Sequence, residues 1–208
     1  IRESGARNAV DIALLGRFLT SEEFTSVDAA MQVAHALGTQ KVELEYDYFS
    51  AVDDHGEGPG AGMIGESEFA SSVFYEYAVC DWKTLVGHLH GDADLAANSM
   101  KAVALAIARA VPKGKANGTA PQNPTDYLEV VVRRNAPISL ANAFVKPVRP
   151  TDARDVMESS IDALRDYAER CDGAYSAKDD VVGRFVLTLR TPAHGRAVET
   201  RRESLDAL

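Results

Sequence analysis

The spacing of apolar residues along the chain predicts both helices and strands. Residues 127–133 and 181–189 are rich in β-branched residues and are predicted to be strands. Residues 93–111 are alanine-rich and precede Pro112, and residues 152–171 carry apolar residues at helical spacing, so both segments are predicted to be helices. The chain therefore contains both kinds of element in alternation.

Shorter segments add to this pattern. Residues 82–89 are predicted to form a helix that begins after Asp81 as its N-cap and closes near Gly91. Residues 27–37, 68–79 and 140–148 are predicted to be strands, whereas residues 9–19 fit either a short helix or a buried strand. The charged tail, residues 196–208, is expected to be mobile or a short helix.

The order of these elements favours an α+β fold with a mostly antiparallel sheet and flanking helices. Strands and helices alternate without regular βαβ repetition, and no internal repeat is found. A length of 208 residues fits one ordinary domain or two small ones.

One segment does not fit a packed core. Residues 56–65 form a glycine-rich loop whose expected tip is the apolar pair Met63 and Ile64. Glycine frees the backbone, and the apolar pair has no evident core to join, so the loop is suited to inserting into something outside the domain.

Composition and charge narrow the function classes. Hydrophobic residues make up 46% and charged residues 25%, with no apolar run long enough for a membrane span and no signal-peptide pattern, so a soluble cytoplasmic protein is expected. The formal charge of −9 argues against general nucleic-acid binding, although residues 111–125 and 133–154 are locally basic. Cys80 and Cys171 are expected to be reduced thiols.

Six blocks of sequence resemble the backbone subunit of type I-E CRISPR Cascade, which polymerises along a guide RNA. The blocks are residues 10–18, 27–36, 48–54, 65–75, 111–115 and 139–144. The resemblance implies an RRM-like (ferredoxin-type) palm, with a thumb insertion at about residues 43–68. It also implies that residues 1–208 are one palm-type domain lacking the family's N-terminal part, including most of its fingers.

The resemblance further implies which residues contact RNA. Met63 and Ile64 correspond to the thumb tip, and Tyr48, Phe49 and Ser50 to its base beside a displaced nucleotide. Phe18 corresponds to an apolar wedge against the guide–target duplex, where the family often has methionine. Arg17 precedes this wedge, and Lys113, Lys115 and Asn117 lie in a polar loop suited to contacting phosphates.

Ordinary packing is the alternative for most of these aromatic residues. Phe49, Phe69, Phe74, Tyr75 and Tyr77 would usually be core residues of a strand pair. The resemblance favours base stacking for Tyr48 and Phe49 only, while Phe69 and Phe74 are expected to remain in the core.

The implied function is that of a non-catalytic scaffold subunit without a cofactor. Its implied partners are guide RNA, copies of itself, other Cascade subunits and target DNA through the guide, and no membrane. A metal-dependent ribonuclease that uses Asp53, Asp54, Glu66 and Glu68 is the rival hypothesis, because carboxylates can bind Mg²⁺ for phosphodiester cleavage.

Overall fold

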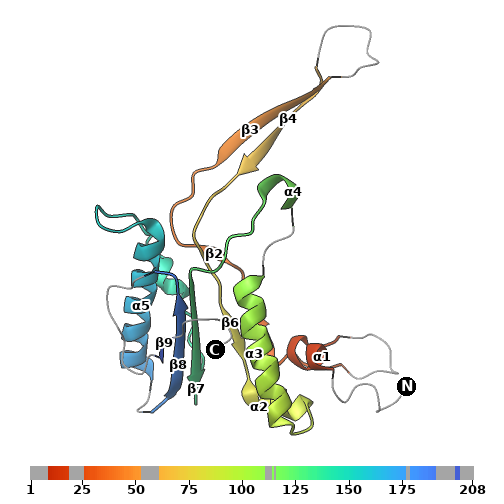
Figure 1. Ribbon diagram of the computed structural model, residues 1–208, viewed down its shortest axis with the longest axis vertical. Helices are drawn as coiled ribbons and strands as arrows, with labels where there is room; N and C mark the ends of the chain where they lie inside the picture. The colour runs from red at the N-terminus through yellow and green to blue at the C-terminus, as the bar shows by residue number, and fades with distance from the viewer. Residues whose placement is uncertain are drawn as a thin grey trace.

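The computed structural model describes residues 9–18, 26–52, 61–110, 114, 116–176, 179–190 and 200–201. The protein is α+β, as predicted, with short antiparallel sheets and helices around them (Figure 1). A long β-hairpin projects from one end of the molecule, and helices α1 and α2 lie toward the opposite end (Figure 1). No helix in these ranges is long and apolar enough to cross a membrane.

The helical part of the body is built around a small apolar core. It contains α1 (Val10–Leu15), β1 (Met31–Val33), β6 (Ala78–Cys80), α2 (Trp82–His88) and α3 (Ala93–Arg109). Strands β1 and β6 pair antiparallel, and the buried core residues of these elements include Leu14, Met31, Leu85, Leu89 and Ala96. The first ambiguous segment is therefore a helix, shorter than the expected 9–19.

Local capping signals explain where the predicted helices begin. The backbone N–H of Thr84 donates to Asp81 Oδ1 at 2.9 Å, as expected for the N-cap of α2. Helix α5 (Val156–Tyr175) begins after Asp155, which forms a capping box with Glu158. Helix α5 therefore begins later and ends later than the predicted 152–171.

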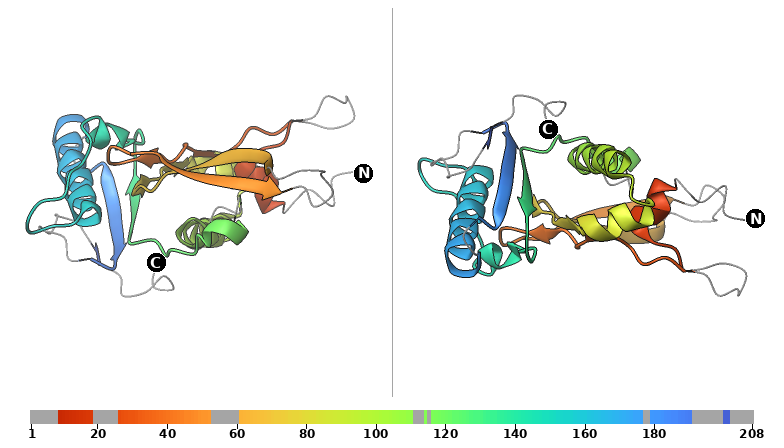
Figure 2. Two further views of the ribbon diagram at one scale, coloured as in Figure 1. Left: turned by 90° about the horizontal axis from the view of Figure 1, so that it is seen from above. Right: turned by 90° about the horizontal axis from the view of Figure 1, so that it is seen from below.

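The second part of the body is a small sheet covered by α5. Strand β7 (Tyr127–Arg133) pairs antiparallel with β8 (Val181–Thr188), and both match their predictions closely. Strand β9 (Thr200–Arg201) adds to β8 in parallel, so at least these two tail residues are extended rather than helical or mobile. Figure 2 shows α5 against one face of this sheet and α3 beyond the other.

Two predicted strands are wrong as continuous elements. Residues 68–79 are expected to form one strand, but the chain changes its pairing partner twice, from the end of β4 (Ala61–Phe69), paired with β3, to β5 (Phe74–Tyr75) and then to β6. Strand β5 pairs with β2 (Leu37–Gly38), so residues 27–37 are likewise divided between two short strands. Phe69 and Phe74, expected in the core, are exposed: Phe69 ends β4 and Phe74 begins β5, and each of these strands belongs to a two-stranded sheet.

The strand predicted for residues 140–148 is also wrong. Ala141–Phe144 forms a 3₁₀ helix, η1, and only Val148 makes a β-bridge, to Gln40. Contacts with Tyr75 hold this segment in place: the Leu140 N–H donates to Tyr75 Oη at 3.0 Å, and the Phe144 and Tyr75 rings lie 5.5 Å apart. Side-chain packing therefore replaces the strand pairing that local sequence favoured.

The projecting hairpin is attached to the body at Thr39. The Thr39 N–H donates to Val73 O, and its carbonyl accepts from the Val148 N–H, both at 2.9 Å. Its buried hydroxyl lies 2.8 Å from the hydroxyl of Ser160 on α5. The chain entering the hairpin is thus tied to the returning chain, to the segment after η1 and to α5.

Candidate nucleic-acid interface

The hairpin formed by β3 (Glu45–Val52) and β4, here called the arm, carries most of the predicted contact residues. The strands pair antiparallel, with Tyr48 opposite Glu66, Phe49 opposite Gly65 and Ser50 opposite Ile64. Successive residues of a strand point to opposite faces, whereas directly opposed residues share a face. The arm therefore presents two different surfaces.

One face of the arm combines tyrosines with carboxylates. Tyr46 lies opposite Glu68 and Tyr48 opposite Glu66, and both tyrosines are exposed, Tyr48 with 71% of its surface accessible. Further along the same face, Ser50 and the 74%-exposed Ile64 form an uncharged pair. This face is acidic near the body and apolar farther out.

The other face is shaped by an aromatic ring lying over a glycine. A Cβ atom added at Gly65 would lie 2.4 Å from Phe49 Cζ, far closer than two carbon atoms can approach, so the ring occupies the space that a side chain would fill. Phe49 therefore lies on the face opposite Tyr48. One displaced base cannot stack on both residues, although the sequence had placed them together.

The structure also corrects the positions of the expected tip and base. Met63 and Ile64 belong to β4, paired with Ala51 and Ser50, and are not in the turn of the hairpin. Tyr48, Phe49 and Ser50 lie along the middle and outer part of β3 instead of at its base. The glycines of this stretch predict a loop, but Gly62 and Gly65 belong to β4: Gly65 is paired with Phe49, and Gly62 lies at a register shift of the ladder.

The remaining predicted contact residues lie away from the arm or outside the described residues. Arg17 makes a two-way backbone pair with Val27, at 2.8 Å for each hydrogen bond, and the next residue, Phe18, is 84% exposed. Both follow α1, at the end of the molecule opposite the arm (Figure 1). Asn117 is exposed on α4 (Ala116–Thr119), whereas Lys113 and Lys115 lie outside the described residues.

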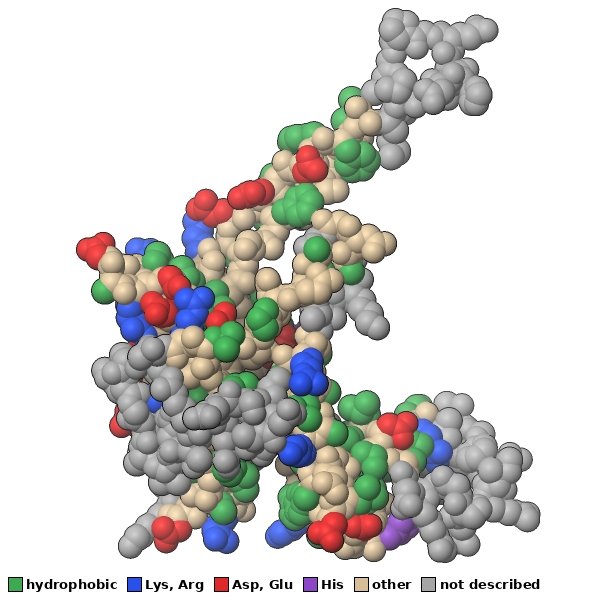
Figure 3. All heavy atoms as spheres, in the orientation of Figure 1, with side chains coloured by type: hydrophobic (Ala, Val, Ile, Leu, Met, Phe, Trp, Pro, Cys, Tyr) green, Lys and Arg blue, Asp and Glu red, His purple; other side chains and the backbone are tan. Residues whose placement is uncertain are grey.

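The arm has no cationic side chain to hold a phosphate backbone. Between residues 42 and 82 the sequence contains ten carboxylates and no lysine or arginine. Since the formal net charge of the whole chain is −9, the rest of the chain is close to neutral. In Figure 3 the described part of the arm shows acidic and hydrophobic side chains, with basic ones only near its root. The absence of lysine and arginine from residues 42–82 is visible in the sequence, but only the strand register shows on which face of the arm each carboxylate lies.

The rival metal site lies partly outside the described residues. Within them, no group of three or more His, Cys, Asp and Glu side chains is placed to hold a metal ion. Glu66 and Glu68 share one face of β4, two residues apart, while Asp53 and Asp54 lie outside the described residues. The ribonuclease hypothesis therefore stays a prediction about the whole set of four carboxylates.

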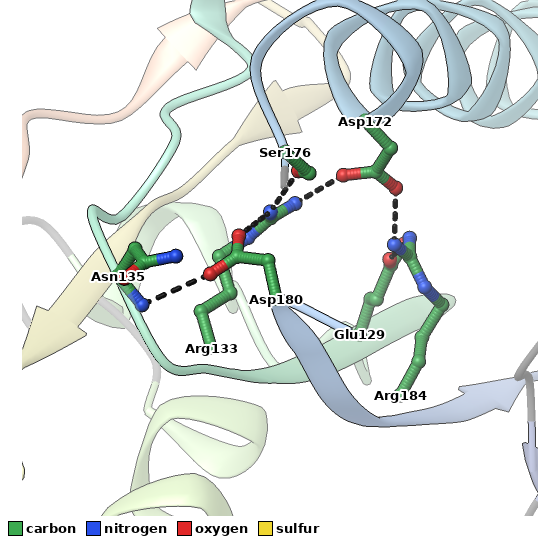
Figure 4. A network of polar contacts seen from close by, with 7 residues as sticks. All are labelled: Glu129, Arg133, Asn135, Asp172, Ser176, Asp180 and Arg184. Carbon is green, nitrogen blue, oxygen red and sulfur yellow. Dashed lines mark hydrogen bonds and ion pairs between the residues drawn. The ribbon is translucent and has the colours of Figure 1, made fainter. Parts of the chain in front are cut away.

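A buried ionic network holds α5 to the sheet of the body (Figure 4). Arg184 on β8 donates to Glu129 on β7 and to Asp172 on α5, both at 2.5 Å. Arg133 on β7 contacts the other oxygen of Asp172 and also donates to Asp180 at 3.1 Å. Each of the two guanidinium groups thus bridges two carboxylates, and the sheet face toward α5 carries these charges beside apolar residues such as the fully buried Val186.

Asp180 and Asp155 have lowered pKa values, and we therefore expect the protein to lose stability in acid. Burial by itself raises the pKa of the Asp180 carboxyl, but hydrogen bonds from the Asn135 N–H and Arg133 outweigh it and lower the pKa below the ordinary 3.8. The Glu158 N–H likewise lowers the pKa of the Asp155 carboxyl. A carboxyl with a depressed folded-state pKa stabilises the fold above its unfolded pKa and loses that contribution as the pH falls through the folded value.

We therefore expect the free energy of unfolding to decrease as the pH falls below about 4, the ordinary range of aspartate. Urea titrations between pH 7 and pH 3 measure the loss. The Asp180→Asn variant is the control: it should be less stable at neutral pH and lose less on acidification. Parallel pH profiles for the two proteins would contradict the assignment to Asp180.

The model of the CT1975-like protein family matches residues 2–208. No curated protein matches. A chain of a CRISPR RNA-guided surveillance complex, pre-nicking, is similar with a TM-score of 0.80 and 30% identity, over 96% of this chain and 55% of that one. A second, from a CRISPR RNA-guided surveillance complex, has a TM-score of 0.80 and 32% identity, over 95% and 76%. This chain spans little more than half the length of the first.

Proposed function

This chain belongs to the CT1975-like protein family, and from that premise we propose that it is a non-catalytic scaffold subunit of a CRISPR RNA-guided surveillance complex. In this proposal it binds guide RNA, assembles with copies of itself and with other subunits, and meets target DNA through the guide. A cytoplasmic location and a type I-E complex belong to the same proposal. The two similar chains come from complexes of this description and align with almost all of this chain.

The observation that carries the proposal is the arm itself. A two-stranded hairpin whose apolar and aromatic side chains remain exposed has little to gain from projecting into water, because buried apolar area is the main stabilising term of a fold. Such an arm is stabilised when it lies on a partner. We propose that it is the thumb, and that the body, with its β7–β8–β9 sheet and α5, is part of an RRM-like palm.

The arm and the end of α1 supply different contacts in this proposal. The outer, uncharged part of the arm, with Phe49, Ser50 and Ile64, interrupts base stacking in the guide. Phe18 forms a wedge against the guide–target duplex from the opposite end of the molecule. The lysines at 113 and 115 and Arg17 add phosphate contacts, which make binding salt-dependent. Base pairing between guide and target, and not the protein, recognises the nucleotide sequence of the target.

Target binding by two exposed-residue variants tests this assignment. Replacing Ile64 or Phe18 by aspartate should weaken binding of target DNA to the guide-loaded complex about ten- to hundredfold, since contacts of this kind contribute about 1–3 kcal/mol each. Folding should be unchanged because both side chains are exposed. Tyr175→Asp is the matched control, because Tyr175 is 81% exposed on α5 and has no proposed RNA contact.

Three outcomes would contradict the proposal in different ways. Intact target binding by Ile64→Asp or Phe18→Asp would remove that residue from the interface. A full-length protein that neither shifts guide RNA in a gel nor forms length-dependent ladders on it would overturn the scaffold function. Mg²⁺-dependent RNA cleavage that disappears in Asp53→Ala or Asp54→Ala would establish the ribonuclease instead.

A further inference from the structure

One asparagine of the chain is followed by glycine. Asn117 precedes Gly118 on α4, whereas the other five asparagines are followed by alanine, serine or proline. An asparagine side chain can react with the backbone nitrogen of the next residue. Glycine favours this reaction because it has no Cβ to crowd that nitrogen or to restrict the backbone. The pair is therefore the point of the sequence where an asparagine amide is most easily lost.

Both residues of this pair are open to solvent. Asn117 and Gly118 are exposed, and nothing comes within 4 Å of a Cβ atom added at Gly118. Among the residues that the structure describes, the Asn117 amide has no hydrogen-bond partner. Water therefore reaches both reacting groups, and no hydrogen bond from these residues restrains the amide.

Helix α4 holds the two residues only weakly in helical geometry. It has four residues, Ala116–Thr119, lies beyond the end of α3 (Figure 1), and has a length at which a helix is marginal in water. Gly118 is its third residue, so the Gly118 N–H has no acceptor within the helix. Ala120 follows with φ +43°, a left-handed conformation that is strained for alanine. The turn therefore opens readily, and the Asn117 side chain then reaches the Gly118 nitrogen.

We propose that Asn117 is a site of spontaneous deamidation. The Gly118 nitrogen bonds to Asn117 Cγ, the C–N bond of the side-chain amide breaks, and the amide nitrogen leaves as ammonia with the proton that Gly118 gives up. The product is a cyclic imide. One water molecule then opens either of its two carbonyls, which leaves aspartate or isoaspartate, the isomer whose backbone continues through the side-chain carbon atoms. Each product adds one negative charge at neutral pH, and the reaction consumes only water.

The new charge falls in a segment without carboxylates. Residues 111–125 contain Lys113 and Lys115 and neither aspartate nor glutamate. Under the proposed function, on which this consequence rests, these lysines contact RNA phosphates. A carboxylate two residues after Lys115 repels the same phosphates. Deamidation of Asn117 therefore lowers the affinity of the protein for guide RNA as the protein ages.

Peptide mapping of the full-length protein, aged at physiological temperature and pH, measures the modification itself. The peptide that contains Asn117 should acquire the mass of a carboxyl in place of an amide, in two isomers that chromatography separates. A synthetic peptide of residues 113–122 gives the rate for the unstructured sequence, and the protein should react within about tenfold of it. Gly118→Ala should slow the reaction about tenfold or more, because a Cβ at residue 118 hinders the attack.

Asn98 is the matched control within the same molecule. It is exposed and is followed by Ser99, but it lies inside the 17-residue helix α3. There the Ser99 N–H is bonded along the helix, and the Ser99 hydroxyl donates to Leu95 O at 2.6 Å. Asn98 should keep its amide throughout. If Asn117 in the protein is as slow as Asn98 while the peptide is converted, α4 protects the pair and the inference is overturned.

RNA titrations test the consequence separately. Asn117→Asp reproduces one product and should bind guide RNA about two- to fivefold more weakly, by an amount that decreases as salt is added. Asn98→Asp adds the same charge on α3 and should bind as the unmodified protein does. Equal affinity for all three proteins would overturn the effect on RNA binding. If the unmodified protein does not bind guide RNA, the proposed function fails, while the peptide map still decides whether Asn117 is deamidated.

Discussion

Replacing Arg184 by leucine is expected to lower the free energy of unfolding by about 3–5 kcal/mol, because it leaves two carboxylates without a shared cation in a buried site. The Arg184 side chain is 4% exposed and is the ion-pair partner of both Glu129 and Asp172. A domain of this size is stabilised by only about 5–15 kcal/mol in total, so the loss is a large part of its stability. Urea unfolding followed by circular dichroism measures it.

Arg190 provides the matched control. It also joins two carboxylates, those of Asp126 and Asp155, but its side chain is 36% exposed. Water solvates exposed charges that lose their partner, so Arg190→Leu should cost far less than Arg184→Leu. If both variants lost the same free energy of unfolding, burial of the network would not determine how much the network contributes to stability.

Replacing Gly16 by alanine is expected to destabilise the fold by several kcal/mol. Gly16 follows α1 with φ +76° and ψ 175°, a conformation that is strained by about 1–3 kcal/mol for any residue with a side chain. An added Cβ would also lie 2.7 Å from Val27 O and 2.9 Å from Ala29 N, both of them backbone atoms that cannot rotate away. The backbone pair between Arg17 and Val27 would have to shift.

Gly87 tests the same substitution at a site without the positive φ and without the close backbone atoms found at Gly16. It lies inside α2, and nothing comes within 4 Å of an added Cβ. Gly87→Ala should therefore stabilise the protein by up to about 1 kcal/mol, the usual difference in helix propensity. Urea midpoints for both variants provide the measurement. An unchanged midpoint for Gly16→Ala would refute the steric argument.

Elements with strong local signals could be predicted from the sequence. The N-cap at Asp81, the alanine-rich helix before Pro112 and the β-branched strands β7 and β8 each depend on a few neighbouring residues, and the structure has them close to the expected positions. The interruption of residues 68–79 could not be predicted, because it depends on three pairing partners that are distant in sequence. The same holds for η1, which is held by Tyr75.

The sequence singled out the segment that forms the arm, but it did not predict the geometry of the arm. The glycine-rich stretch correctly drew attention to residues that project from the body, yet glycine also favoured a loop where Gly65 serves to accommodate the Phe49 ring. The opposite orientation of Tyr48 and Phe49 depends on strand register, which is set by pairing across the arm.

The attachment at Thr39 has a mechanical consequence. An arm of eight paired residues extends about 27 Å, so a sideways load on its outer end becomes a torque at the point of attachment. The contacts that resist this torque include the two backbone hydrogen bonds of Thr39, its hydroxyl contact with Ser160 on α5, and the pairing of β2 with β5. A force on the outer end of the arm is therefore transmitted through Thr39 and Ser160 to α5.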